Sequence, residues 1–239
     1  MYGWRARAGL IVPSVNSTAE TELGPRMPDG VSSHVSRMYL EDGTVDHLEK
    51  MAGEAEESAS LLGTADVDVI AYTCTAGSLH EGLGFDEQLE SELSEAAGGV
   101  PTVATAASIK RAFDALGLER LSVTAPYIDD LNDLEVEFLE ASGYDVTNMN
   151  GLGIKSGLEI GAQKQEDTYR TVREADHSGA DAVFISCTNL PTLDIIEKLE
   201  ADLGMPVLSS NQATLWDVMQ NLPVSPEEPV GPGTLFEET

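Results

Sequence analysis

The sequence predicts an α/β protein made of two pseudo-symmetric, Rossmann-like halves, each a parallel sheet with helices, and an active site in the cleft between them. The first observation is a phrase that occurs twice, DVIAYTCT at residues 68–75 and DAVFISCT at residues 181–188. Each copy has the length and β-branched content of a fully buried parallel strand. The second observation is that strand-like and helix-like segments alternate, which predicts parallel sheets with right-handed crossovers.

The spacing of landmarks is the third observation. Leu10 lies 64 residues before Cys74, and Leu121 lies 66 residues before Cys187. A Gly-x-Pro strand start follows each cysteine phrase, GVPTV at 99–103 and GMPVL at 204–208. We interpret this order as a duplication; the alternative is one doubly wound domain with chance similarity. The expected first half is 1–106, completed by 211–222, the second is 107–210, and an irregular C-terminal tail covers 223–239.

In the first half, an apolar run at 8–13 predicts the opening strand, and any of residues 16–18 can cap a short helix with an acidic first turn. Alternation at 31–40 predicts the second strand, and an amphipathic pattern predicts a helix at 44–62. The cysteine strand follows. The remaining expected elements of this half are a helix at 85–97 that ends at Gly98-Gly99, a strand at 101–104 and a helix at 108–116.

The second half repeats this order. A strand at 120–125 is again followed by a proline, and the second cysteine strand begins at Asp181. The other strands are expected at 144–149 and 206–209. The helices are expected at 131–141, 158–177, 193–203 and 213–222, with 158–177 as one long helix.

Composition limits the function. The chain has 42 acidic and 13 basic residues and a formal net charge of −29. This excess argues against binding to nucleic acid or to anionic membranes, which requires basic patches. With 41% hydrophobic residues in regular runs, the chain is expected to fold, and its acidity indicates a halophilic protein that works in concentrated salt.

No apolar run approaches the about 20 residues of a spanning helix, and the N-terminus shows no signal-peptide pattern. We therefore expect a cytoplasmic protein whose only two cysteines are reduced thiols. The four histidines are scattered and the cysteines are unpaired in spacing, so no metal site is expected.

Both cysteines lie at the carboxyl end of a predicted strand, where open α/β sheets place their ligand sites. We predict that the two thiols face each other across a cleft. Backbone N–H groups after each cysteine should favour anions, lower the thiol pKa and bind a carboxylate. The small or polar residues at these positions are Thr75, Ala76, Thr188 and Asn189. The alternative for a single cysteine is a buried, inert apolar residue.

Two opposed thiols permit racemisation by proton transfer on both faces, cis–trans isomerisation by addition to a double bond, or protonation of a carbanion after decarboxylation. Asn16 and Tyr127 each follow the proline that ends the first strand of their half. Both are candidates for donating a hydrogen bond to a substrate carboxylate; the alternative is that they are turn residues. His80 is a candidate base, but an exposed histidine on a helix face is the favoured interpretation.

The segments GLIVPSVN at 9–16, SCTNL at 186–190 and PVLSSNQATLW at 206–216 resemble the aspartate/glutamate racemase superfamily. Within it, they are similar to the branch of maleate cis–trans isomerase and arylmalonate decarboxylase. The resemblance implies no cofactor and a homodimer that acts on a small carboxylate. It implies that Cys74 adds to the double bond of maleate, that Cys187 transfers a proton, and that Asn16 and Tyr127 hold carboxylates while fumarate forms.

Two positions depart from these patterns. The decarboxylases carry Gly where this chain has Cys74, which argues against decarboxylation. The isomerases carry a substrate-binding Asn where this chain has Gly157. The open alternatives are a two-cysteine racemase or epimerase of an aspartate, glutamate or hydantoin type of substrate, an arylmalonate-decarboxylase-like enzyme, and a non-catalytic carboxylate sensor.

Overall fold

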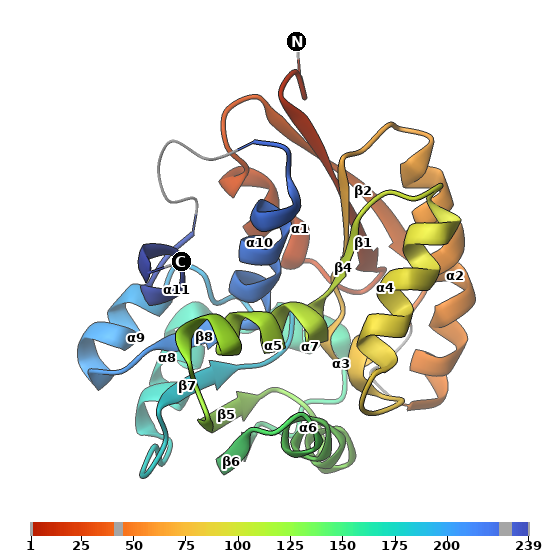
Figure 1. Ribbon diagram of the computed structural model, residues 1–239. Coiled ribbons are helices and arrows are strands. Elements are labelled where there is room, and N and C mark those ends of the chain that lie inside the picture. The colour runs from red at the N-terminus through yellow and green to blue at the C-terminus, as the bar shows by residue number, and fades with distance from the viewer. Residues whose placement is uncertain (1, 41–44, 225–230, 239) are drawn as a thin grey trace.

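The computed structural model describes residues 2–40, 45–224 and 231–238, and it contains two four-stranded, all-parallel sheets (Figure 1). The first sheet has the order β2-β1-β3-β4 and the second has the order β6-β5-β7-β8. The orders are identical once each half is numbered from its first strand. The predicted pair of pseudo-symmetric α/β halves is therefore confirmed. The strands are β1 (Ala6–Pro13), β2 (Val31–Met38), β3 (Val69–Tyr72), β4 (Thr102–Ala104), β5 (Arg120–Ala125), β6 (Asp145–Gly151), β7 (Ala182–Ile185) and β8 (Val207–Ser209).

Register places the two cysteines equivalently. Ile11 pairs with Tyr72 at the end of β3, and Thr124 pairs with Ile185 at the end of β7. One further backbone hydrogen bond continues each pair, from Thr73 N to Ile11 O and from Ser186 N to Thr124 O, both 2.9 Å. After this hydrogen bond the backbone leaves each sheet, and the next residue is the cysteine.

The helices are α1 (Ala19–Leu23), α2 (Val45–Gly63), α3 (Thr75–Leu79), α4 (Phe85–Ala96), α5 (Thr105–Leu116), α6 (Asp129–Ala141), α7 (Gly157–Gly161), α8 (Gln165–Glu174), α9 (Ile196–Leu203), α10 (Ser210–Asn221) and α11 (Thr234–Glu238), with a 3₁₀ turn at Gly24–Arg26. The short helix α11 lies in the segment expected to be irregular. Helix α10 begins three residues before its predicted start, because Ser209 and Gln212 form a reciprocal capping box.

The prediction of one helix at 158–177 is wrong, because the segment forms α7 and α8 with a break between them. The last residue of α7, Gly161, packs so closely against its neighbours that a Cβ atom there would lie 2.6 Å from Ser17 Oγ of the first half and 2.9 Å from Asn189 Oδ1 of its own half. Lys164 is extended and is the N-cap residue of α8, which begins at Gln165. Tertiary packing, which a helical periodicity does not report, ends the first helix here.

The core joins the two halves. Its larger apolar cluster contains Leu10 and Ile70 of the first sheet and reaches Val183 and Ile185 of β7. Helices α5 and α10 pack against each other between the sheets (Figure 1). Helix α5 packs on the second sheet, and α10 contributes residues to both apolar clusters. The predicted boundary, in which the first half ends at residue 106 and is completed by 211–222, therefore stays a proposal. No helix in the described ranges is both long and apolar enough to span a membrane.

Candidate active site

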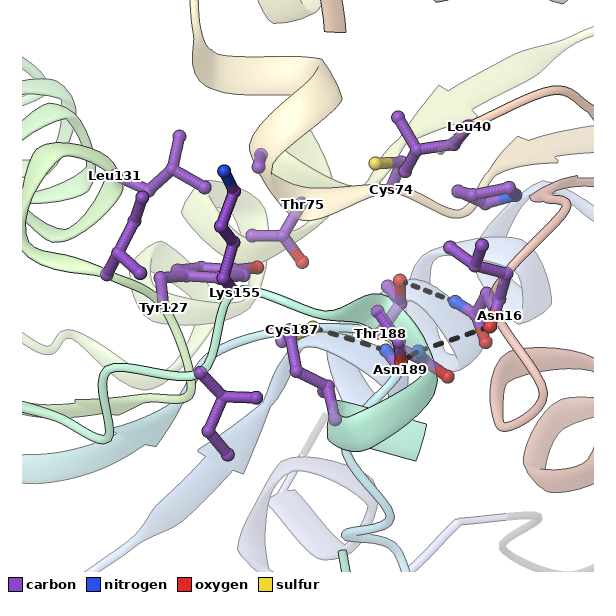
Figure 2. A pocket seen from close by; sticks show the side chains of 17 residues that line it. Asn16, Leu40, Cys74, Thr75, Tyr127, Leu131, Lys155, Cys187, Thr188 and Asn189 are labelled. Carbon is purple, nitrogen blue, oxygen red and sulfur yellow. Dashed lines mark hydrogen bonds between the residues drawn. The ribbon is translucent and has the colours of Figure 1, made fainter. Parts of the chain in front are cut away.

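A pocket lies at the carboxyl ends of the central strands of both sheets (Figure 2). Both cysteines line it, one from each half, and both are free and only 7% exposed. The six predicted substrate-binding residues also line it, namely Asn16, Thr75, Ala76, Tyr127, Thr188 and Asn189. The rest of the described lining is mainly apolar: Pro13, Val15, Leu40, Ile128, Leu131, Ile154, Lys155, Gly157 and Ile160.

Cys74 is the N-cap residue of α3 and has an ordinary extended backbone, with φ −144° and ψ 107°. Its sulfur accepts a hydrogen bond from Gly77 N at 3.4 Å. A Cβ atom at Gly77 would lie 2.5 Å from Tyr72 Oη and 3.0 Å from this sulfur, so only glycine fits there. The local sequence thus brings a backbone donor directly to the thiol.

Cys187 has a different backbone. Its φ of +91° is in the region that favours glycine, a conformation that costs a side-chain-bearing residue about 1–3 kcal/mol. Its N–H donates to Ser210 Oγ at 3.0 Å, and its sulfur accepts from Asn189 N at 3.4 Å. The Tyr127 hydroxyl lies close enough to this sulfur to lower its pKa. Such strain at a thiol inside a pocket is typical of a functional residue.

Both thiols are neutral in this environment. Burial raises the pKa of Cys74 to about 12 and the pKa of Cys187 to about 11. The N–H of Gly77 and the Tyr127 hydroxyl act in the opposite direction but are outweighed by desolvation. The prediction that backbone N–H groups lower these pKa values is therefore wrong in its outcome, because apolar groups from both halves keep water from the sulfurs.

Asn16 has two roles at the edge of the pocket. Its Oδ1 accepts from Thr18 N and Ala19 N, both at 2.9 Å, and so caps α1. Its Nδ2 donates one hydrogen to Thr188 Oγ1 at 3.1 Å, and the Thr188 hydroxyl donates to Thr73 O at 2.9 Å. Since an amide nitrogen carries two hydrogens, the second is available to a carboxylate.

Asn189 and Thr75 mainly connect the halves. The Asn189 side chain accepts from Ser17 N at 3.0 Å and donates to Gly157 O at 2.7 Å. The Thr75 hydroxyl donates to Ser210 Oγ at 2.9 Å. Ser210 therefore contacts both cysteine loops, since it also accepts from the N–H of Cys187.

Tyr127 is buried, and burial raises its pKa well above 10, so the phenol remains a neutral donor. Its carbonyl accepts from Gly153 N at 3.0 Å and from Asn132 Nδ2 at 3.1 Å, which fixes the turn after β5. His80 does not line the pocket. Its ring is buried, its Nδ1 lies 3.1 Å from Gly77 O, and it packs edge-on against Phe85, so the expectation of an exposed histidine is wrong.

Three polar residues near the site were not found from the sequence. Glu135 is buried beneath the Cys187 loop and accepts from Ser186 Oγ, and burial raises its pKa to about 7. Glu22 accepts from the backbone of the Cys187 loop and from Asn211, and burial raises its pKa also. Ser210 is the third. The available signal was an acidic residue on the apolar face of a helix, at Glu135.

The family model for arylmalonate decarboxylase matches residues 8–236. The chain belongs to this family. It lies in the branch of the family that contains maleate isomerases: a curated maleate isomerase from Geobacillus stearothermophilus is 33% identical over 229 residues, which cover 90% of this chain and 91% of the relative.

Solved structures of the family show the same architecture. The maleate isomerase of Pseudomonas putida S16, a cysteine-to-alanine variant with maleate, has a TM-score of 0.92, 28% identity and 98% coverage of both chains. A cysteine-to-serine mutant of the Nocardia farcinica maleate cis-trans isomerase holds a covalently bound succinylcysteine intermediate. It has a TM-score of 0.91 and 27% identity and covers 98% of this chain and 99% of that one. These relatives indicate that the chain is an isomerase.

Proposed function

We propose that this family member is a cofactor-independent maleate cis–trans isomerase, in which Cys74 adds to the double bond and Cys187 transfers a proton. The observation that carries the proposal is that two thiols from equivalent positions of the two halves line one pocket. A dicarboxylate alkene between two sulfurs presents one carbon for addition and its neighbour for protonation.

The reaction balances without an oxidant or a reductant. The reaction starts in the fraction of molecules in which Cys74 has lost its proton to solvent while Cys187 keeps its own. The Cys74 thiolate forms a C–S bond with one alkene carbon, and the electron pair of the double bond moves toward the adjacent carbon and its carboxylate. The Cys187 S–H protonates that carbon, which gives a saturated succinyl thioether. Rotation about the new single bond follows. Cys187 then takes a proton back, the C–S bond breaks, and fumarate leaves with the Cys74 thiolate restored.

The intermediate carries extra negative charge on one carboxylate, and donors aimed at that group stabilise it. The neutral Tyr127 hydroxyl and the remaining hydrogen of Asn16 Nδ2 are such donors. The succinylcysteine in the Nocardia farcinica enzyme supports an adduct at this oxidation level. Apolar side chains around the sulfurs exclude water, which would otherwise compete as a proton source.

The test is an NMR assay of the purified protein with maleate, in which fumarate should appear. Cys74→Ala and Cys187→Ala should each abolish turnover while the far-UV circular dichroism spectrum stays unchanged. Fumarate formation that survives in either variant would contradict the two-cysteine mechanism.

A racemase or epimerase is the second candidate, because one buried thiol from each half suits proton transfer on both faces of a carbon. The same assay in deuterated water separates the two. Exchange at the α-carbon of aspartate, glutamate or a hydantoin without any fumarate from maleate would favour the racemase.

A further inference from the structure

The pocket holds one charge. Among its described lining residues, Lys155 is the only charged side chain, in a chain whose formal net charge is −29. Lys155 is exposed, so it lies where the apolar pocket meets solvent. A dianion that leaves water for an apolar site needs a compensating charge.

The backbone before Lys155 is fixed. Three successive N–H groups, those of Leu152, Gly153 and Ile154, donate to the carbonyls of 125–127 at 2.8–3.0 Å. This clamp sets the segment on the turn that carries Tyr127. The position of the Lys155 Cα atom is thus tied to the site, while its four-carbon stem allows the ammonium group to reach a ligand.

Position 157 has no room for a side chain that could donate a hydrogen bond in the pocket. A Cβ atom at Gly157 would lie 2.7 Å from Cγ2 and 3.2 Å from Cβ of Val15, so Val15 occupies the space of a side chain at 157. Both residues line the pocket. The segment that carries Gly157 can therefore offer a polar side chain to the pocket from Lys155 but not from position 157.

The donors lie in two groups. Figure 2 shows Asn16 with Thr188 and Asn189 on one side, and Lys155 with Tyr127 on the other. We propose that Lys155 binds one of the two substrate carboxylates, on the Tyr127 side, and so selects dicarboxylates over their monoamides. This inference rests on the proposed function, since it names the subsite for the second carboxylate of maleate.

A lysine ammonium donates charge-assisted hydrogen bonds, which are roughly twice as strong as neutral ones, whereas its exposure to solvent screens the attraction. We therefore expect about a tenfold effect on affinity, toward the low end for hydrogen bonds to charged groups. An amide in place of the carboxylate removes the charge that Lys155 recognises and keeps the shape of the ligand.

The test is calorimetric binding of maleate and of maleamate, its monoamide, in the Cys74→Ala background, where no turnover interferes. Adding Lys155→Met should weaken maleate binding about tenfold and remove the preference for maleate over maleamate, whereas Lys155→Arg should keep most of that preference. Lys164→Met, at an exposed lysine outside the pocket, is the matched control and should change neither dissociation constant.

Two failures are distinguishable. A maleate dissociation constant that changes less than about twofold in Lys155→Met, or an undiminished preference over maleamate, would overturn the Lys155 subsite even if the wild type produces fumarate. Conversely, a wild type that produces no fumarate, together with a tenfold Lys155 effect on maleate binding, would reject the isomerase and support the subsite.

Discussion

The two cysteine loops begin alike and end differently. Each follows a four-residue strand, and each sulfur accepts one backbone N–H at 3.4 Å. Cys74 then caps a helix in a relaxed extended conformation, whereas Cys187 is held at a positive φ by a loop that Ser210 fixes from α10. Tyr127 lowers the pKa of Cys187. The two halves supply equivalent positions for the cysteines, and the surroundings of the two sulfurs differ.

The surroundings of the two sulfurs bear on the proposed roles. Burial raises the pKa of both thiols, to about 12 for Cys74 and about 11 for Cys187. Tyr127 can stabilise the Cys187 thiolate after it gives up its proton. This neighbour suits Cys187 for the proton transfer that we propose.

The largest expected effect is on the pH dependence of catalysis. Because both thiol pKa values are raised above 10, the thiolate fraction grows about tenfold per pH unit from pH 7 to pH 9. Initial rates at low maleate, which report kcat/KM, should rise by about a hundredfold over this interval. A plateau already at pH 7 would show that one thiol has a lowered pKa in the working enzyme.

Glu135 lies near Cys187, so replacing it changes the surroundings of Cys187 without changing those of Cys74. Its pKa of about 7 is above the ordinary value of 4.5, so the folded state retains its proton as the unfolded state ionises, and stability falls as pH rises through this window. Glu135→Gln removes that loss and should stabilise the protein at pH 8 by about 2–3 kcal/mol more than at pH 5. Urea unfolding at both pH values measures the difference.

Glu137→Gln, at an exposed position on the same helix, is the control and should show no such dependence on pH. Equal effects of Glu135→Gln at pH 5 and pH 8 would mean that Glu135 does not titrate with a raised pKa. Because the Glu135 charge raises the pKa of Cys187, the variant should also move the alkaline limb of the rate profile, which reports loss of the Cys187 proton, to lower pH.

The smallest expected effect concerns the backbone. At Cys187, Gly should be more stable than Ala by about 1 kcal/mol, because it removes the strain at φ +91°. At Cys74, with φ −144°, Gly should be less stable than Ala by about 0.5–1 kcal/mol. The four unfolding free energies give opposite signs at the two sites. The same sign at both would contradict the difference in strain.

The sequence was sufficient for the features that depend on local pattern. The apolar runs before Cys74 and Cys187 predicted the strands, their parallel pairing and the meeting of both thiols at one pocket. It failed where distant segments decide the outcome. The thiol pKa values follow from burial by both halves, and the end of α7 follows from its contact with Ser17 and Asn189. The bridging role of Ser210 depends on three segments at once, which no spacing reveals.

The most direct test of the account is the site of covalent addition. Cys187→Ser leaves Cys74 as the only thiol, and incubation with maleate should add the mass of one maleic acid molecule to the protein, mapped to Cys74 by peptide mass spectrometry. Cys74→Ser should form no adduct. An adduct on Cys187 in the Cys74→Ser protein, with none on Cys74 in its counterpart, would contradict the assigned roles.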